Sequence, residues 1–295
     1  CNHNDPVVTG SPKGWMAIAI HGDDGIAVAS SDSLFDFVNK AISKVYKSKW
    51  TRWKKILGYN VDIQPCEDGS SVVSVSARDA LDELDTKFLS DKVKIQPKHC
   101  MTPQISSLGP GVPPPSDSPD YADFLKMQAD TRSMLGIGIW ITRVHVQAMT
   151  AINIPCEFMA NPSFEVYKQV LFTCMHLVSH AIPLRFAAGH NSLIIQPGKY
   201  ICPGSDEQEF GFHSFVDAGL ERRAITGYVA QLAGTVIDAM CQRQQLMAPD
   251  AYTAEVVAGG TATHRIIPVR GLLHELGILQ LAGTSLNIDS QSAIY

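Results

Sequence analysis

Residues 210–240 read FGFHSFVDAGLERRAITGYVAQLAGTVIDAM and decide the fold of the C-terminal part of the chain. The stretch contains short apolar runs separated by polar or glycine-containing segments, a pattern typical of successive strands. We expect three strands here, at residues 210–216, 224–232 and 235–240.

A helix and a further strand are expected after these three strands. Asp250 is a suitable N-cap for the helix. Pro268 is expected to break it, because proline removes a backbone donor and clashes with the preceding turn. A second short helix at 269–276 then leads to a strand at 285–289. The order strand, strand, strand, helix, strand predicts a mixed α/β domain.

Three carboxylates fall near the ends of these predicted elements. Asp217 follows the first strand, Glu255 lies just over one turn into the helix, and Asp289 ends the last strand. Where a helix packs across a sheet, these positions can converge, and three converging carboxylates would bind Mg²⁺ or Mn²⁺. Two such ions, about 4 Å apart, catalyse phosphodiester cleavage in many enzymes. Taken singly, each acid is more often a solvated surface residue.

A second pair of acids, Asp23 and Asp24, lies between two apolar runs within residues 15–29, flanked by Gly22 and Gly25. This pattern predicts a β-hairpin with the acids at its tip. Adjacent like charges are costly unless a cation neutralises them, and nucleotide polymerases hold Mg²⁺ with such a pair. A polar two-residue turn explains the same residues equally well.

A basic segment without acids follows a helix expected at residues 32–45, for which Ser31 or Ser33 is a candidate cap. Lysine and arginine neutralise phosphates, and tryptophan can stack on a base, so the segment is a candidate nucleic-acid contact. A solvated charged face with two buried tryptophans is an equal alternative. The candidate nucleic-acid contacts are Lys47, Lys49, Trp50, Arg52, Trp53, Lys54 and Lys55.

The middle of the chain contains a predicted domain boundary. Residues 101–120 include six prolines and read as an extended linker. Before it, we expect a hairpin at 56–75 and a helix opened by a capping box at 76–79. After it, residues 121–182 are helical in character, and the clearest helix begins at 161–163.

Composition excludes several classes of protein. The 295 residues are 45% hydrophobic and 18% charged, as in globular proteins, and no apolar run is long enough to span a membrane. The net charge of -5 means that any basic nucleic-acid surface must be local. Seven cysteines without paired spacing favour a reducing, intracellular compartment, cytoplasmic or nuclear. The first residue is Cys1, and we expect both ends to be truncated.

Two histidines share a predicted helical face. His176 and His180 are four residues apart, with Cys174 close by, which is a spacing that can bind a metal. No fourth ligand is near in sequence, so a structural role is the stronger expectation.

Several motifs together resemble the ribonuclease H domain of copia-type LTR retrotransposon polyproteins, and from Gly227 to Gly277 the similarity runs without a gap. The motifs are Arg223-Ala-Ile-Thr-Gly-Tyr-Val229, Gly234-Thr-Val-Ile237, Gln244, Ala254-Glu-Val-Val-Ala258, Arg270-Gly-Leu-Leu-His-Glu-Leu-Gly277 and Asp289-Ser-Gln-Ser-Ala-Ile294.

The similarity continues toward the N-terminus and covers nearly the whole chain. Segments 132–136, 139–142, 158–162 and 167–171 resemble the connection between reverse transcriptase and ribonuclease H. Ile56-Leu-Gly58 and Thr102-Pro103 are similar to palm and thumb landmarks, and His21-Gly-Asp-Asp24 occupies the position of the polymerase Xaa-Xaa-Asp-Asp motif.

The resemblance implies four regions. Residues 1–100 would be the C-terminal palm and thumb of a reverse transcriptase, 101–120 the linker, 121–183 a helical connection, and 184–295 a ribonuclease H-like mixed sheet with helices. It assigns catalytic metal ligands, for Mg²⁺ or Mn²⁺, in both activities. These are Asp23 and Asp24 for the polymerase, and Asp217, Glu255 and Asp289 for the nuclease. The implied partners are RNA template, DNA primer, RNA–DNA hybrid and, in the intact parent, dNTP.

The chain departs from the family in several places. An earlier palm aspartate, the fingers, the last ribonuclease H acid and the closing helix are missing, and Gly219 stands where a second acid is common. Gly259 and Gly260 lie inside the helix of Glu255, where each costs about 1 kcal/mol relative to alanine. We therefore expect neither activity from these 295 residues alone.

Two other interpretations compete with an enzyme fragment. The chain can be a degenerate or co-opted, non-enzymatic piece that binds nucleic acid or protein. An RNA-virus polymerase is suggested by the Gly-Asp-Asp triplet, but everything downstream follows the retroelement order.

Overall fold

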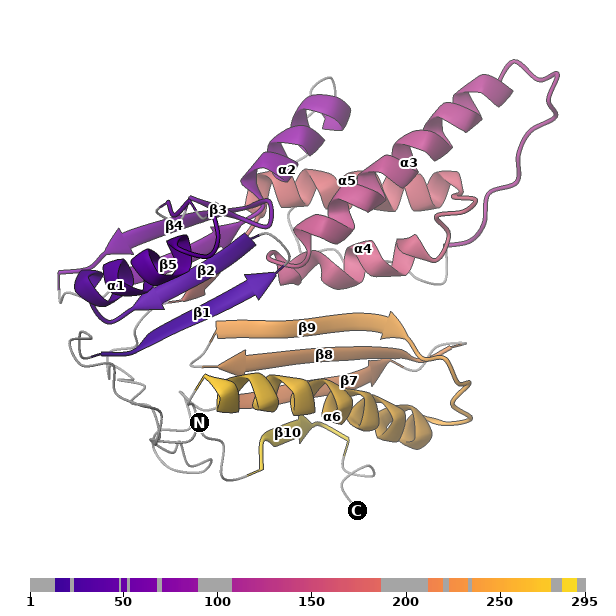
Figure 1. The fold of residues 1–295 in the computed structure, drawn as a ribbon. Helices are drawn as coiled ribbons and strands as arrows, with labels where there is room; N and C mark the ends of the chain where they lie inside the picture. Colours follow the sequence, from indigo (N-terminus) through magenta and orange to yellow (C-terminus); the bar gives the residue numbers. More distant parts are fainter. Residues whose placement is uncertain are drawn as a thin grey trace. The chain divides into compact units, whose positions relative to one another are not determined.

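The structure, a computed structural model, is mixed α/β and divides into two compact units, residues 1–58 and 59–295 (Figure 1). No helix among the residues described is both long and apolar enough to cross a membrane. The structure describes residues 14–21, 24–47, 49–51, 54–67, 71–89, 108–186, 212–219, 223–232, 235–276 and 283–290.

The first unit contains the predicted hairpin and helix. Strands β1 (Met16–His21) and β2 (Asp24–Ala29) pair antiparallel, and α1 (Asp32–Ser43) follows. Of the two candidate caps, Ser31 is the one used, since its hydroxyl accepts a hydrogen bond from the Leu34 amide at 3.3 Å. A short strand, β3 (Lys55–Ile56), ends the unit.

The second unit begins with an antiparallel sheet formed by β4 (Tyr59–Pro65), β5 (Ser71–Ser76) and the later strand β6 (Leu184–Phe186). Helix α2 (Arg78–Leu84) follows β5 and continues into one π-helical turn, η1 (Asp85–Leu89). The predicted capping box at 76–79 is wrong. Ser76 is still paired within β5, so the N-cap is Ala77, and Asp79 accepts a hydrogen bond from the Asn60 side chain instead.

Three helices confirm the helical character expected for residues 121–182. They are α3 (Tyr121–Ile141), α4 (Met149–Cys156) and α5 (Phe164–His180), with a 3-10 turn η3 (Val146–Ala148) before α4. One core joins these helices to the segment from β4 to η1. Its fully buried side chains include Leu84, Leu135, Ile152, Val166, Val170 and Leu177.

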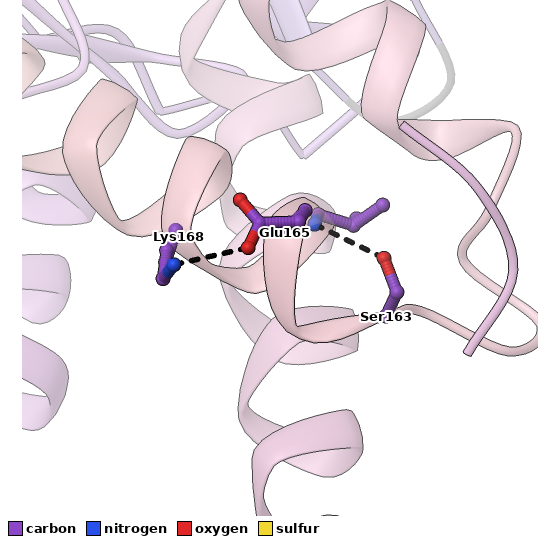
Figure 2. A network of polar contacts seen from close by, with 4 residues as sticks. Ser163, Glu165 and Lys168 are labelled. Atoms are coloured by element: carbon purple, nitrogen blue, oxygen red, sulfur yellow. Dashed lines mark hydrogen bonds and ion pairs between the residues drawn. The ribbon is translucent and has the colours of Figure 1, made fainter. Parts of the chain in front are cut away.

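Helix α5 starts where its sequence predicts. The Ser163 hydroxyl accepts from the Val166 amide at 3.3 Å, and Glu165 pairs with Lys168 at 3.0 Å along the first turn (Figure 2). Arg132 of α3 stabilises the turn before α5, because it donates hydrogen bonds to the carbonyls of Met159 and Ala160 at 3.0 and 2.7 Å. These contacts join segments 132–136 and 158–162, which both resemble the connection of the retrotransposon family.

A four-stranded sheet lies at the C-terminal end of the second unit. Its strands are β7 (Phe212–Gly219), β8 (Ile225–Leu232), β9 (Thr235–Arg243) and β10 (Ser285–Ile288), in the order β10-β7-β8-β9. The first three pair antiparallel and β10 runs parallel to β7. The four strands confirm the predicted elements. The apolar run Leu193-Ile-Ile195 also favours a strand by its sequence, but it lies outside the described residues.

Helix α6 (Ala251–Glu275) covers one face of this sheet (Figure 1). Asp250 caps it as predicted, accepting from the Thr253 amide at 2.7 Å. The predicted break at Pro268 is wrong, and a separate helix at 269–276 does not form. Ile266 before the proline and Leu273 after it are both buried in the same core, so packing on the sheet carries the helix through.

Candidate metal centre

The three carboxylates singled out in the C-terminal module meet at one point. One oxygen from each of Asp217, Glu255 and Asp289 lies within 4.8 Å of the other two. No other cluster of three or more such ligands occurs in the part of the chain that the structure describes. The convergence expected from the order of elements is therefore present in the fold.

Strand register explains why the two aspartates meet. Ile288 of β10 lies opposite Val216 of β7 in the parallel pair. Asp217 follows Val216 within β7, and Asp289 follows Ile288 just past the end of β10, so the two aspartates lie side by side. Parallel pairing is required for this, because only then do the same ends of both strands coincide.

The helix supplies the third acid. Because the Asp250 cap fixes the start of α6, Glu255 falls in its second turn, over the end of β7. The backbone amide of Ala218, adjacent to Asp217, donates a hydrogen bond to the Glu255 carboxylate. This bond ties the helix to the strand at the cluster.

Glu255 is the buried member of the cluster, with 7% of its surface exposed, whereas Asp217 and Asp289 are exposed. Burial raises the pKa of Glu255. The Ala218 hydrogen bond acts in the opposite direction, and the charges of Asp217 and Asp289 raise it further. Among the described residues the buried Oε2 atom of Glu255 has no hydrogen-bond partner. A divalent cation would satisfy that oxygen and relieve the repulsion.

Gln244 connects the first turn of α6 to the sheet. It is buried, and its Nε2 donates to the Thr226 hydroxyl at 3.1 Å and to the Ala254 carbonyl at 2.7 Å. It thereby joins β8 to the residue just before Glu255. Gln244 is one of the residues that resemble the ribonuclease H family, but the resemblance implies no role for it. In the sequence, Gln244 is marked only by its position between a predicted strand and a predicted helix cap. That position does not indicate a role until the fold is known.

A groove of about 440 Å³ adjoins the cluster on the sheet face opposite α6. Asp217 lines it, and Gly227, opposite Asp217 in the β7–β8 register, leaves its floor without a side chain. Gln147 of η3 forms part of the wall, and its buried Nε2 has no partner among the described residues. The groove leaves the Asp217 side of the cluster open.

The other predicted acid pair is only partly described. Asp24 is the first residue of β2 and pairs with His21, whereas Gly22 and Asp23 lie outside the described residues. The hairpin itself agrees with expectation, and the metal-binding role of Asp23 and Asp24 stays a prediction.

The basic segment is also partly described. Lys47, Lys49, Lys54 and Lys55 are exposed, and Arg52 and Trp53 lie outside the described residues. Trp50 is half-buried and meets the Phe35 ring of α1 edge to face, with ring centroids 5.4 Å apart. Trp50 thus has a packing role in the first unit, which favours the structural alternative at that position.

Comparison of the chain with protein-family models, with curated proteins and with solved structures finds no match.

Proposed function

We propose that this chain is a fragment of a copia-type retrotransposon polyprotein whose C-terminal part is a ribonuclease H-like nuclease domain. Its substrate would be the RNA strand of an RNA–DNA hybrid. The observation that carries the proposal is the meeting of Asp217, Glu255 and Asp289 at the parallel β7–β10 pair.

The topology supports this proposal. Three antiparallel strands, a helix across them and a fourth strand parallel to the first form the order expected for a ribonuclease H-like domain. The acids come from the first strand, the helix and the end of the fourth strand. A chance cluster of surface acids would not be expected to combine this topology with a buried glutamate.

The chemistry of the donor set also supports it. All three ligands are carboxylates, which Mg²⁺ and Mn²⁺ prefer over nitrogen or sulfur. When bound, such ions activate water and stabilise the leaving oxygen in phosphodiester hydrolysis. Asp217, Glu255 and Asp289 would hold them. The Ala218 amide would orient Glu255, and the two exposed aspartates would face the substrate.

Metal binding is the first test. Titration with Mn²⁺, followed by calorimetry or by the electron paramagnetic resonance signal of free Mn²⁺, is expected to show binding that Asp217→Asn and Glu255→Gln abolish. Glu83→Gln is a matched control, since Glu83 is exposed on α2 and lies outside the cluster. Equal binding by the wild type and both site variants would contradict the proposal.

Cleavage of an RNA–DNA hybrid separates an enzyme from a binding fragment. We expect no cleavage from the 295 residues alone. Cleavage that is lost in Asp217→Asn would overturn that expectation and establish a working nuclease. Hybrid binding without cleavage, unchanged in Asp217→Asn, would favour the alternative of a co-opted nucleic-acid-binding fragment.

We propose in the same way that residues 1–100 derive from a reverse transcriptase palm and thumb. Asp23 and Asp24 would hold the metal ions for attack of a primer 3′-hydroxyl on the α-phosphate of a dNTP. Primer extension on a poly-rA template with Mg²⁺ tests for activity. We expect none, and clear incorporation would contradict that expectation.

A further inference from the structure

Helix α5 carries a pair of histidines apart from the acidic cluster. His176 and His180 lie one helical turn apart, and their rings are stacked, with centroids 5.1 Å apart and planes 15° from parallel. His180 is the last residue of α5 and is exposed, and His176 is half-buried. Two imidazoles at positions i and i+4 share one face of a helix, the arrangement by which helical metalloprotease motifs bind zinc.

The surroundings of His176 favour its neutral, metal-binding form. Burial lowers the pKa of His176, and the nearby His180 lowers it further, because two adjacent imidazoles resist carrying two positive charges. Neutral imidazole is the form that coordinates metals.

One nitrogen of His176 also lacks a partner. The Nδ1 atom is buried and makes no hydrogen bond among the described residues. A buried polar atom without a partner calls for an explanation, and a bound ion or an ordered water is the usual one. Among the described residues no hydrogen bond fixes the ring at this nitrogen.

We propose that His176 and His180 together bind one divalent transition-metal ion of the Zn²⁺, Ni²⁺ or Cu²⁺ class, with water in the remaining positions. Imidazole nitrogen suits these ions and not Mg²⁺, so this site differs in chemistry from the carboxylate cluster. Metal–nitrogen bonds of about 2.0–2.1 Å require the stacked rings to turn so that one nitrogen of each faces the ion.

Cys174 is not part of this site. It is fully buried in the core of the helical region, and burial raises the pKa of its thiol to about 12. A protonated thiol facing the core does not compete for a metal at the surface of the helix. The proposed site therefore has two protein ligands and does not require the function proposed above.

Calorimetric titration with Ni²⁺ at pH 7.5 tests the proposal, in the full chain carrying Asp217→Asn so that the carboxylate cluster contributes little. We expect one site whose affinity falls about tenfold or more in His176→Ala and in His180→Ala. His264→Ala is the matched control, since His264 is an exposed histidine on α6 and should leave the affinity unchanged.

A thermal melt with and without Ni²⁺ gives a second readout, because an ion that binds only the folded chain raises the melting temperature. This rise should disappear in His180→Ala, a change at an exposed helix end that does not threaten folding. Absence of Ni²⁺ binding, retention of the affinity in either histidine variant, or an equal loss in His264→Ala would each overturn the proposal.

Discussion

Gln244 is a single residue on which the position of Glu255 depends. Its amide joins the Thr226 hydroxyl of β8 to the Ala254 carbonyl of α6. Gln244→Leu keeps the approximate volume but leaves the buried Thr226 and Ala254 groups without their donor. We expect a loss of about 1–3 kcal/mol of stability. Urea denaturation measures it, and the exposed Gln245→Leu is the control, for which no loss is expected.

A positioning role for Gln244 also predicts an effect on metal affinity. If Gln244 holds the first turns of α6 against β8, its loss should also weaken Mn²⁺ binding. A purely structural residue would lower stability alone. Mn²⁺ affinity equal to that of the wild type, measured well below the unfolding transition, would contradict the positioning role.

Without a bound cation, the ionised carboxylate of Glu255 should lower the stability of the folded chain. Its pKa is raised above the ordinary value of 4.5, so folding favours its protonated form. The stability linked to this group is fully present below about pH 4.5 and is lost as the pH rises through the raised pKa. At pH 7 without metal, Glu255→Gln should therefore melt at or above the wild-type temperature, and this advantage should shrink below pH 4.

The same variant should show no stabilisation by Mn²⁺, whereas the wild type should gain stability from it. Differential scanning fluorimetry across pH, with and without Mn²⁺, measures both effects. A metal-free Glu255→Gln chain clearly less stable than the wild type at pH 7 would show that the carboxylate is needed for folding itself.

At the scale of elements, two adjacent glycines of α6 have different environments. A Cβ on Gly259 would lie 3.4 Å from the Ile288 Cδ1 atom of β10, whereas a Cβ on Gly260 would meet nothing within 4 Å. A Cβ at Gly259 would be in van der Waals contact with β10, so this position packs against the strand that ends beside the acidic cluster. Gly259 therefore has a packing role, although it lowers the helix propensity of α6.

Leucine at the two positions should act in opposite directions. Gly260→Leu should stabilise the chain by about 0.5–1 kcal/mol through helix propensity. Gly259→Leu makes the same propensity gain but forces a side chain into Ile288, at a typical cost of about 1–3 kcal/mol. It should also weaken Mn²⁺ binding by displacing Asp289. Denaturant titration of both variants measures the difference, and equal effects would contradict the packing argument.

Local signals predict the ends of some elements and not of others. Ser163 and Asp250 cap helices as their sequences indicate, because a cap depends on residues within one turn. The capping box at Ser76 and the break at Pro268 fail, because strand pairing with Asn60 and burial of Ile266 and Leu273 override the local preference. The acidic cluster is predictable because strand order and direction determine it.

At the scale of the whole molecule, His145 links distant parts of the second unit. It is buried, its Nε2 accepts from the Ala77 amide at 3.1 Å, and its Nδ1 donates to the Ile182 carbonyl at 2.9 Å. It therefore joins the β5–α2 junction to the α5–β6 junction. The Ala77 bond needs the neutral ring, because a protonated Nε2 no longer accepts a hydrogen bond, whereas Nδ1 donates to Ile182 in either state.

Acid should weaken this link. Burial lowers the pKa of His145, which the Ile182 hydrogen bond only partly offsets. The linked stability is present above about pH 6.5, the unfolded pKa, and is lost as the pH falls below it toward the depressed folded pKa. His145→Gln should be less stable than the wild type at pH 8, with a smaller gap at pH 5. Urea midpoints at both pH values measure this, and a constant gap would contradict it.

Stability should also differ between the two units. The β1–β2 sheet has only two strands, and Ile20 and Val28 are 78% and 44% exposed, whereas Tyr228 and Ala230 of β8 lie in a core beneath α6. An isolated two-stranded sheet is marginally stable in water, so β1 and β2 should open by local fluctuations without unfolding of the second unit.

In hydrogen–deuterium exchange at pH 7, amides of residues 16–29 should exchange at least about a hundredfold faster than those of residues 225–232. This ratio corresponds to an opening free energy that is lower by about 3 kcal/mol. Equal protection of the two segments would mean that the hairpin unfolds only with the whole molecule, and the first unit would then be an integral part of one cooperative fold.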